Sequence, residues 1–228
     1  MSRFAKEVIG DAELYLGDCR EILPTLERVD AVVTDPPYGL GDIWGIGGDG
    51  AWPLRDRDMK DGGWDAAICQ EAIDAARAIC EHAIIWGGNY YVLPPRRGWL
   101  LWDKIQDHST AHAEMAWTNL DIPVRKFGYA RAQLASEGKQ HPTQKPLPLM
   151  QWCLGFLPDA TTILDPFMGS GTTGVACMKL GRKFIGIEIE PKYFSIACKR
   201  IEEAWKQPRL FEEPKPKAVQ LDLIGGEA

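Results

Sequence analysis

The 228-residue sequence lacks several features that would direct its interpretation elsewhere. It has no apolar run of the roughly 18 residues that a membrane-spanning helix needs, and its polar first residues, MSRFAKEVIGDAE, do not resemble a secretory signal peptide. Its six cysteines form no CxxC pair, which disfavours a zinc knuckle or a dithiol redox motif. Scattered cysteines without an export signal predict a soluble protein of the reducing cytoplasm.

The sequence also lacks an excess of basic charge. Its formal net charge is −6, which disfavours a protein that binds nucleic acid over its whole surface. The distribution is uneven, because residues 1–75 hold 7 basic against 16 acidic side chains, whereas residues 91–150 hold 8 basic against 5 acidic ones. Only the segment 91–150 is therefore a candidate face for an anionic partner, and a solvated surface of mixed charge is the alternative.

Short apolar strands alternate with amphipathic helices along the chain. Strands are predicted at 13–19, 30–35, 83–88, 98–104, 113–119, 161–167 and 183–190, and helices at 20–27, 66–82, 147–157, 172–180 and 191–205. Asp65 is the expected N-cap of the helix at 66–82. The inward stripe of that helix is expected to be Ile68, Ala72, Ile73 and Ala76. This alternation predicts an α/β fold whose mostly parallel sheet has helices on both faces.

A glycine-rich turn, DPFMGSGTTG at 165–174, stands between a predicted strand and a predicted helix. Gly169, Gly171 and Gly174 form a GxGxxG pattern, which lets backbone N–H groups approach a ligand at the helix N-terminus. Glu188, nineteen positions after Gly169, is placed to bind ribose hydroxyls. Taken alone, the pattern fits a dinucleotide enzyme or a tight turn that binds no ligand.

Asp165 favours a different ligand for this turn. A carboxylate beside the glycines would repel a pyrophosphate and attract an ammonium or a sulfonium group. S-adenosylmethionine carries both of these cations, together with a carboxylate for the helix N-terminus and a ribose for Glu188. The late position of the turn also disfavours a nicotinamide dehydrogenase, in which this turn usually comes first.

The second turn, TDPPYG at 34–39, ends an apolar strand. Its two prolines withhold their backbone nitrogens from a sheet and fix an extended conformation. This rigidity aims the Asp35 carboxylate, the Pro36 carbonyl and the Tyr38 ring at one point beyond the strand. Two acceptors and a flat face suit a planar heterocycle with an exocyclic amino group. A proline-terminated strand with an incidental tyrosine is the alternative.

DPPY followed by DPFMGSGTT resembles the amino-group DNA methyltransferases, which methylate adenine N6 or cytosine N4 from S-adenosylmethionine. The order of the two motifs resembles the circularly permuted β-type of that family. Further similar segments are ELYLGDC, IIWGGNYY, HPTQKPLPLM and GIEIEPKYFSIACKRI, so that the resemblance covers most of residues 13–203. It implies a class I S-adenosylmethionine-dependent methyltransferase fold, Rossmann-like and permuted, in one catalytic domain over 1–205 with an unpacked tail at 206–228.

The resemblance also implies a mechanism in which the target nucleotide is flipped out of the duplex. The catalytic residues would be Asp35, Pro36, Pro37 and Tyr38 of the DPPY motif. Asp35 and the Pro36 carbonyl would accept the amino hydrogens, and Tyr38 would stack on the base. The nitrogen would then attack the sulfonium methyl directly, so that the reaction needs positioning and electrostatics but no catalytic cysteine.

The same resemblance implies a set of residues for the S-adenosylmethionine cofactor. They are Asp18, Asp35, Thr143, Lys145, Asp165, Phe167, Gly169, Gly171, Thr172 and Glu188. Asp18 would contact the cofactor adenine, whereas Thr143 and Lys145 would lie near its methionine moiety.

Target recognition in the permuted order is expected in a small insertion near 104–141. Its candidate DNA-binding residues are Arg125, Lys126, Arg131 and Lys139, with aromatic residues between them. The small size of this segment predicts a short or relaxed site in double-stranded DNA, or recognition shared across a homodimer. DPPY leans toward adenine N6 as the target, and cytosine N4 is the alternative. RNA and protein substrates are less favoured, because glutamine methyltransferases resemble NPPY.

Two further patterns have competing interpretations. The spacing of His108, His112 and Glu114 is compatible with metal ligands, but the expected chemistry needs no metal, and structural or DNA-facing roles are favoured. The segment Gln207–Phe211, QPRLF, resembles the short peptides with which bacterial replication proteins dock on the sliding clamp. Chance occurrence in a tail is the alternative.

Overall fold

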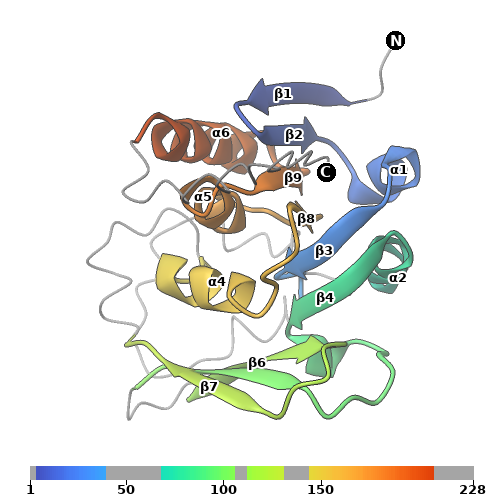
Figure 1. Ribbon diagram of the computed structural model, residues 1–228. Helices are drawn as coiled ribbons and strands as arrows, with labels where there is room; N and C mark the ends of the chain where they lie inside the picture. The colour runs from blue at the N-terminus through green and yellow to red at the C-terminus, as the bar shows by residue number, and fades with distance from the viewer. Residues whose placement is uncertain (1–3, 40–67, 106–111, 131–143, 208–228) are drawn as a thin grey trace, which may run out of the picture.

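The computed structural model describes residues 4–39, 68–105, 112–130 and 144–207 (Figure 1). In this part of the chain the strands form one sheet of order β1-β2-β9-β8-β3-β4-β6-β5-β7. They are β1 Ala5–Ile9, β2 Ala12–Leu16, β3 Val29–Thr34, β4 Cys80–Trp86, β5 Trp99–Asp103, β6 Ala113–Thr118, β7 Arg125–Gly128, β8 Thr162–Asp165 and β9 Lys183–Glu188. The helices are α1 Cys19–Ile22, α2 Gln70–Ala78, α4 Leu147–Leu154, α5 Thr172–Lys179 and α6 Pro191–Lys206, with 3-10 turns at Leu23–Thr25 and Gly88–Tyr90.

The strands that lead into the two motif turns are neighbours in the middle of the sheet. β2, β9, β8, β3 and β4 run parallel, and β3 pairs with β8 through Ala31 and Val32. At the start of this pair, Asp30 accepts hydrogen bonds from the backbone nitrogen and the hydroxyl of Thr161, at 2.8 and 2.7 Å. α5 connects β8 to β9 on one side, whereas α2 precedes β4 on the other. This reversal creates a crevice at the carboxyl ends of β3 and β8, where open α/β sheets bind ligands.

Helices cover both faces of the sheet (Figure 1). α4, α5 and α6 pack together on one face, and α1 and α2 on the other. The central strands are apolar on both sides: Val33 and Ile84 join the core under α4 and α5, whereas Val32 and Ile85 join the core that contains Ile73 of α2. Strands that are covered on both faces have continuous apolar sequences. The predicted α/β architecture is confirmed.

Three local predictions were wrong. The helix predicted over 66–82 ends at Ala78, and residues 80–82 already belong to β4. Its N-cap is Cys69 and not Asp65, which lies outside the described residues. Ile68 precedes the helix and is 44% exposed, so it is not part of the buried stripe. The other predicted members of the stripe, Ala72, Ile73 and Ala76, are buried.

Both edge strands, β1 and β7, were absent from the prediction. Most of their side chains are exposed, so neither strand shows the apolar alternation from which strands are inferred. The hydrogen bonds to a neighbouring strand define them instead, antiparallel to β2 for β1 and parallel to β5 for β7.

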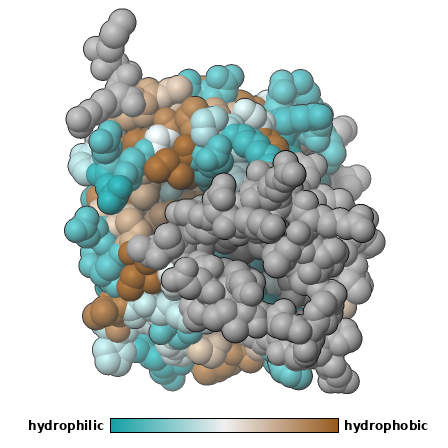
Figure 2. Space-filling view, turned by 180° about the vertical axis from the view of Figure 1, so that it is seen from behind, coloured by the Kyte–Doolittle hydropathy of each residue, from teal (hydrophilic) through white to brown (hydrophobic). Residues whose placement is uncertain are grey.

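The surface offers few further indications of function. Seen from behind, the described part of the surface mixes hydrophilic and hydrophobic residues (Figure 2). Within the four described ranges, no helix combines the length and the apolar composition that crossing a membrane requires. All six cysteines lie in these ranges and are free.

Candidate active site

A cavity of about 800 Å³ opens where β3, β8 and β9 end. Its volume is typical of a site for a small molecule or cofactor. The predicted residues that line it are Asp18, Asp35, Pro37, Lys145, Asp165, Phe167, Gly169, Thr172 and Glu188. The structure therefore brings both motif turns to one cavity, although they are far apart in the sequence.

The glycines of the second motif have different roles. Gly169 and Gly171 adopt left-handed backbone conformations, with φ of 52° and 78°. Gly169 lines the cavity, whereas a Cβ at Gly171 would meet the Cβ of Ala197 on α6 at 3.0 Å. A Cβ at Gly174 would lie 2.6 Å from the Ile201 side chain. Gly169 thus shapes the ligand side of the turn, and the other two let α5 pack closely on α6.

Glu188, at the end of β9, holds the glycine turn against the cavity. Its Oε2 accepts a hydrogen bond from the Gly169 backbone nitrogen at 2.9 Å, and its Oε1 accepts one from Glu190 at 2.8 Å. Burial raises the pKa of this carboxyl, while the backbone donors act in the opposite direction. Each carboxylate oxygen has a second lone pair, which leaves capacity to accept hydroxyl donors from a ligand.

Asp165, at the end of β8, joins three elements. Its Oδ1 accepts hydrogen bonds from the hydroxyl of Thr34 at 2.7 Å and from the backbone nitrogen of Phe167 at 3.1 Å. Its Oδ2 accepts one from the hydroxyl of Thr173 on α5 at 2.7 Å. Burial raises the pKa of Asp165 to about 6, against the opposing effect of these donors. The carboxyl thus has a structural role in addition to its place on the cavity wall.

Asp18 lies at the rim of the cavity and caps α1. Its Oδ1 accepts a hydrogen bond from the Arg20 backbone nitrogen at 2.9 Å, and its Oδ2 lies 2.5 Å from the Arg20 guanidinium. This guanidinium lowers the pKa of Asp18. The rim therefore carries a fixed negative charge beside a cation.

Asp35 follows β3 and is largely buried. Its Oδ1 accepts a hydrogen bond from the Tyr38 hydroxyl at 2.6 Å, and its Oδ2 lies 2.5 Å from the Lys145 ammonium. Burial raises the pKa of Asp35, and the Lys145 ammonium opposes that shift. The hydrogen bond between Tyr38 and Asp35 was not predicted from the sequence, which indicated only that both side chains are aimed at one point beyond the strand.

The Tyr38 ring is positioned by residues after β4. It stacks on the ring of Tyr90, with centroids 5.0 Å apart and planes at 19°. Gly87 has φ of 64°, and a Cβ there would lie 2.0 Å from the Tyr38 ring. The neighbouring Tyr91 donates a hydrogen bond from its hydroxyl to the Pro37 carbonyl. The GGNYY segment therefore fixes the Asp-Pro-Pro-Tyr turn.

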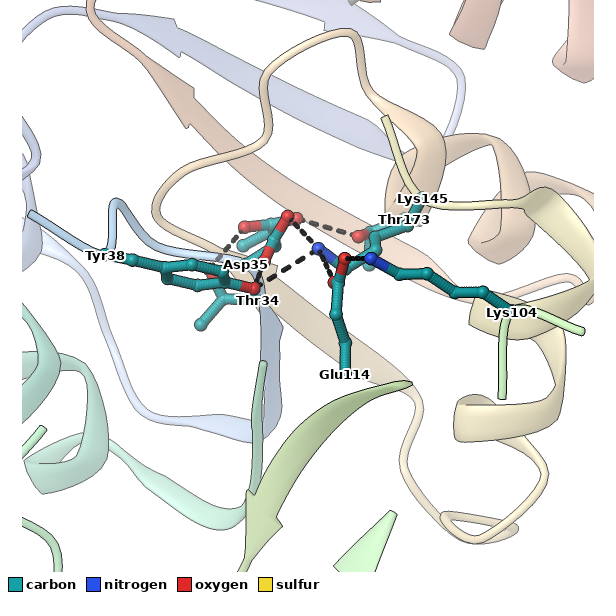
Figure 3. A network of polar contacts seen from close by, with 8 residues as sticks. Thr34, Asp35, Tyr38, Lys104, Glu114, Lys145 and Thr173 are labelled. Carbon is teal, nitrogen blue, oxygen red and sulfur yellow. Dashed lines mark hydrogen bonds and ion pairs between the residues drawn. The ribbon is translucent and has the colours of Figure 1, made fainter. Parts of the chain in front are cut away.

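Sequence reasoning missed the charged side chains behind Asp35 (Figure 3). Lys145, just before α4, lies 2.9 Å from Oε2 of Glu114 on β6. The other oxygen of Glu114 lies 2.6 Å from the ammonium of Lys104, which follows β5. Burial acts to raise the pKa of Glu114, but these two ammonium groups lower it further, to about 2. Lys145 lines the cavity as predicted, and it also contacts Asp35 directly.

The sequence offered one signal for this cluster. Glu114 is a lone carboxylate in the otherwise apolar and small segment AEMAW, which is unusual for a strand with buried residues. From its spacing to His112, the sequence analysis weighed a metal site against structural or DNA-facing roles and favoured the latter, without a partner for Glu114. Within the described residues, no group of histidine, cysteine and acidic side chains is arranged to hold a metal ion, and His108 lies outside them.

The predicted DNA-binding residues lie apart from the cavity where the structure describes them. Arg125 and Lys126 are exposed on β7, and Lys126 forms an ion pair with Asp103 at 3.0 Å. Neither lines the cavity. Arg131, Lys139 and the cofactor candidate Thr143 lie outside the described residues.

Comparison with protein families gives a match for part of the chain. Residues 101–199 match the model of a family described as DNA methylase. Over these residues the chain is similar to that family. The matched region contains Glu114, Lys145, the glycine turn and Glu188, whereas Asp35 lies before it.

Two curated relatives match part of the chain closely. Type II methyltransferase M2.DpnII of Streptococcus pneumoniae is 53% identical over 64 residues, and M2.LlaDCHI of Lactococcus lactis subsp. cremoris is 52% identical over 63 residues. These segments make up 28% and 27% of this chain. The chain thus matches about a quarter of the length of each relative, 24% and 23%.

Solved structures resemble the chain over most of its length. The M1.HpyAVI–SAM complex has a TM-score of 0.55 and 25% identity, covering 83% of this chain and 98% of that one. The cytosine-N4-specific PvuII DNA methyltransferase has a TM-score of 0.56, and the match covers 87% of this chain and 90% of that one. Its identity is 14%, so this likeness shows the fold alone. The chain has the predicted class I S-adenosylmethionine-dependent methyltransferase fold.

Proposed function

We propose that this protein transfers a methyl group from S-adenosylmethionine to adenine N6 in double-stranded DNA, in the cytoplasm. The observation that carries the proposal is the position of Asp35 on the wall of a cofactor-sized cavity. Asp35 and Asp165 end adjacent parallel strands, so that an amino group at Asp35 and a ligand above the glycine turn would be neighbours.

The residues of the cavity fit S-adenosylmethionine. Glu188 supplies carboxylate acceptors for ribose hydroxyls, and the exposed edge of Gly169 lets the ligand approach the backbone. Asp18 supplies an acceptor at the rim. When bound, S-adenosylmethionine supplies an electrophilic methyl group on a sulfonium sulfur.

The chain itself positions the nucleophile. The Asp35 carboxylate accepts an N–H of the target amino group and so orients the nitrogen lone pair toward the cavity. The aromatic pair Tyr38 and Tyr90 offers a flat surface for the ring of the base. A negative charge at Asp35 would stabilise the positive charge that develops on nitrogen as the N–C bond forms and the sulfonium S–CH3 bond breaks, releasing S-adenosylhomocysteine. The methylated nitrogen would then lose one of its protons to solvent. The Asp-Pro-Pro-Tyr turn then performs catalysis by positioning and electrostatics, without a covalent intermediate.

The adenine target rests on the DPPY sequence of the turn, residues 35–38. Cytosine N4 is the alternative, since its amino group presents the same two hydrogens to Asp35. The cytosine-N4-specific structural relative shares only the fold and does not favour that alternative.

DNA contacts in this proposal come from the small insertion near 104–141. Arg125 and Lys126 are exposed on β7, which supports contact with phosphates, and the proposal extends it to Arg131 and Lys139. Such contacts make binding salt-dependent, and each substitution of these cations is expected to weaken binding to all sequences similarly.

Two protein partners belong to the same proposal. A homodimer would enlarge the recognition surface of so small an insertion. A sliding clamp would bind Gln207–Phe211, of which Pro208–Phe211 lie outside the described residues. A pull-down with purified clamp tests the second contact: Phe211→Ala should abolish capture, and undiminished capture contradicts the contact.

A transfer assay tests the function. The protein is incubated with radiolabelled S-adenosylmethionine and unmethylated duplex DNA, and the DNA is then digested to nucleosides. N6-methyladenine is the expected product. N4-methylcytosine would replace the proposed base, and label in RNA or protein but not in DNA would overturn the proposed substrate.

A further inference from the structure

The charged groups behind Asp35 form a buried chain of alternating sign (Figure 3). It runs from Asp35 through Lys145 and Glu114 to Lys104, with contacts of 2.5, 2.9 and 2.6 Å. The Lys145 side chain is 5% exposed and that of Lys104 is 9% exposed. The carboxylates of Asp35 and Glu114 are partly exposed, at 19% and 23%. Charges that are so largely removed from solvent are costly unless each is paired.

Both oxygens of Asp35 are engaged in this structure. Tyr38 donates to Oδ1, and the Lys145 ammonium occupies Oδ2. Asp35 and Lys145 both line the cavity, so an amino group that approaches Oδ2 along the direction now taken by Lys145 replaces that ammonium. Lys145 then keeps a partner, because its ammonium already lies 2.9 Å from Oε2 of Glu114.

Glu114 is built to receive the ammonium. Its second oxygen is held 2.6 Å from the Lys104 ammonium, so the carboxylate is fixed from behind. The same two lysines keep Glu114 ionised, since they lower its pKa to about 2 in spite of burial. Without Glu114, release from Asp35 would leave a buried ammonium with no counter-charge.

We propose that Glu114 is a positioning residue that holds the Lys145 ammonium when the target amino group replaces it on Oδ2 of Asp35. This inference rests on the proposed function. The exchange leaves the negative charge of Asp35 facing the reacting nitrogen instead of being neutralised by Lys145. That charge is then available where positive charge develops during methyl transfer.

Kinetics of Glu114→Gln test the proposal. The substitution keeps the shape of the side chain and removes the charge that holds Lys145. Single-turnover methyl transfer at saturating cofactor and DNA should slow about 30-fold or more, while the Kd for S-adenosylmethionine stays within about twofold. The matched control is Glu202→Gln on α6, which removes an exposed ion pair with Lys206 and should leave the rate unchanged.

The background of Lys145→Met separates positioning from a merely structural role. With no ammonium to relocate, Glu114→Gln should slow transfer by no more than about threefold further. An unchanged rate for Glu114→Gln alone, or the same fold loss in both backgrounds, would overturn the proposal. Thermal unfolding of each variant identifies losses that come from misfolding.

A crystal structure of Asp35→Ala gives a test that needs no activity. Lys145 should remain within about 3 Å of Glu114, since this carboxylate is its second partner. An ammonium turned away from Glu114 would overturn the proposal. If the unaltered protein methylates no DNA, the proposed function fails, and this structure still decides whether Glu114 alone can hold the ammonium.

Discussion

Asp35 and Asp165 follow or end adjacent parallel strands, yet their surroundings differ completely. Asp35 contacts the ammonium of Lys145 and one tyrosine hydroxyl. Asp165 contacts two threonine hydroxyls and a backbone nitrogen, and no cation of the described residues forms an ion pair with it. Burial raises the pKa of both carboxyls.

The difference distinguishes a carboxyl whose ionic partner can be exchanged from a carboxyl that connects elements of the fold. The partners of Asp165 belong to β3, α5 and the glycine turn, so its hydrogen bonds connect elements that must stay together. The ionic partner of Asp35 has a second carboxylate within reach, so it can be exchanged. On the proposed function, the same residue type serves a reaction after one strand and the structure of the cavity at the end of the next.

Asp35→Ala should have the largest effect, and it tests whether Asp35 takes part in methyl transfer. Methyl transfer to DNA is expected to fall about a thousandfold or more, because the acceptor for the amino group is lost. Cofactor affinity and the thermal unfolding midpoint should change little. The measurement is single-turnover transfer beside calorimetric titration of S-adenosylmethionine. A variant that keeps most of its activity would remove Asp35 from the proposed mechanism.

Asp165→Asn should change how the free energy of unfolding depends on pH, which tests the structural role of Asp165. The folded state raises the pKa of Asp165 from 3.8 to about 6, so the folded protein holds the extra proton between these values. Its contribution to the free energy of unfolding is therefore complete below pH 4 and is lost as the pH rises through 6, a loss of about 3 kcal/mol. Urea unfolding from pH 4 to 8 should show this decline in the unaltered protein and its absence in the variant. Parallel curves for the two proteins would contradict the raised pKa.

Gly87→Ala should displace the Tyr38 ring that contacts Asp35, while the hydrogen bonds of Asp165 stay intact. The new methyl group would lie 2.0 Å from the Tyr38 ring, at a residue with φ of 64°. We expect a loss of about 2 kcal/mol in stability and a fall in transfer of about 30-fold. Gly128→Ala on β7 is the control, because its methyl group would meet only the flexible Ile105 side chain, at 3.2 Å. Equal behaviour of the two variants would show that the position of Tyr38 is unimportant.

Glu188→Gln should have the smallest effect, and it separates cofactor binding from the chemical step. The amide keeps one acceptor oxygen but loses the charge, so the Kd for S-adenosylmethionine should rise about tenfold. The rate at saturating cofactor should change less than about threefold, since Asp35 is untouched. Calorimetric titration measures the first quantity and single-turnover transfer the second. A large loss of rate at unchanged affinity would place Glu188 in the chemical step.

The sequence was sufficient for the parts of the site that depend on local geometry. Asp35, Tyr38, Gly169 and Glu188 stand in short motifs whose prolines, glycines and flanking strands fix the backbone. The α/β alternation then places both motifs at the carboxyl edge of a parallel sheet. Asp35, Gly169 and Glu188 do meet at one cavity, and Tyr38 is hydrogen-bonded to Asp35.

The remainder depends on distant pairing that periodicity does not encode. Glu114 reaches Lys145 only because β6 pairs antiparallel with β4, and Lys104 joins them through the pairing of β5 with β6. The edge strands β1 and β7 gave no apolar pattern because their side chains face solvent. The boundary at Ala78 was missed because the polar residues that open β4 continue the helical pattern.

The pairing of β3 with β8 has a consequence for biosynthesis. Contacts between Asp30 and Thr161 at one end of the pair, and between Thr34 and Asp165 at the other, each span 131 positions of sequence. Closing so long a loop is slow compared with forming local structure. A ribosome-bound chain that has released the Asp-Pro-Pro-Tyr turn but not β8 has no cavity beside it. The ability to methylate DNA should therefore arise late in synthesis, in one step, when β8, α5 and β9 pack against strands that have already been synthesised.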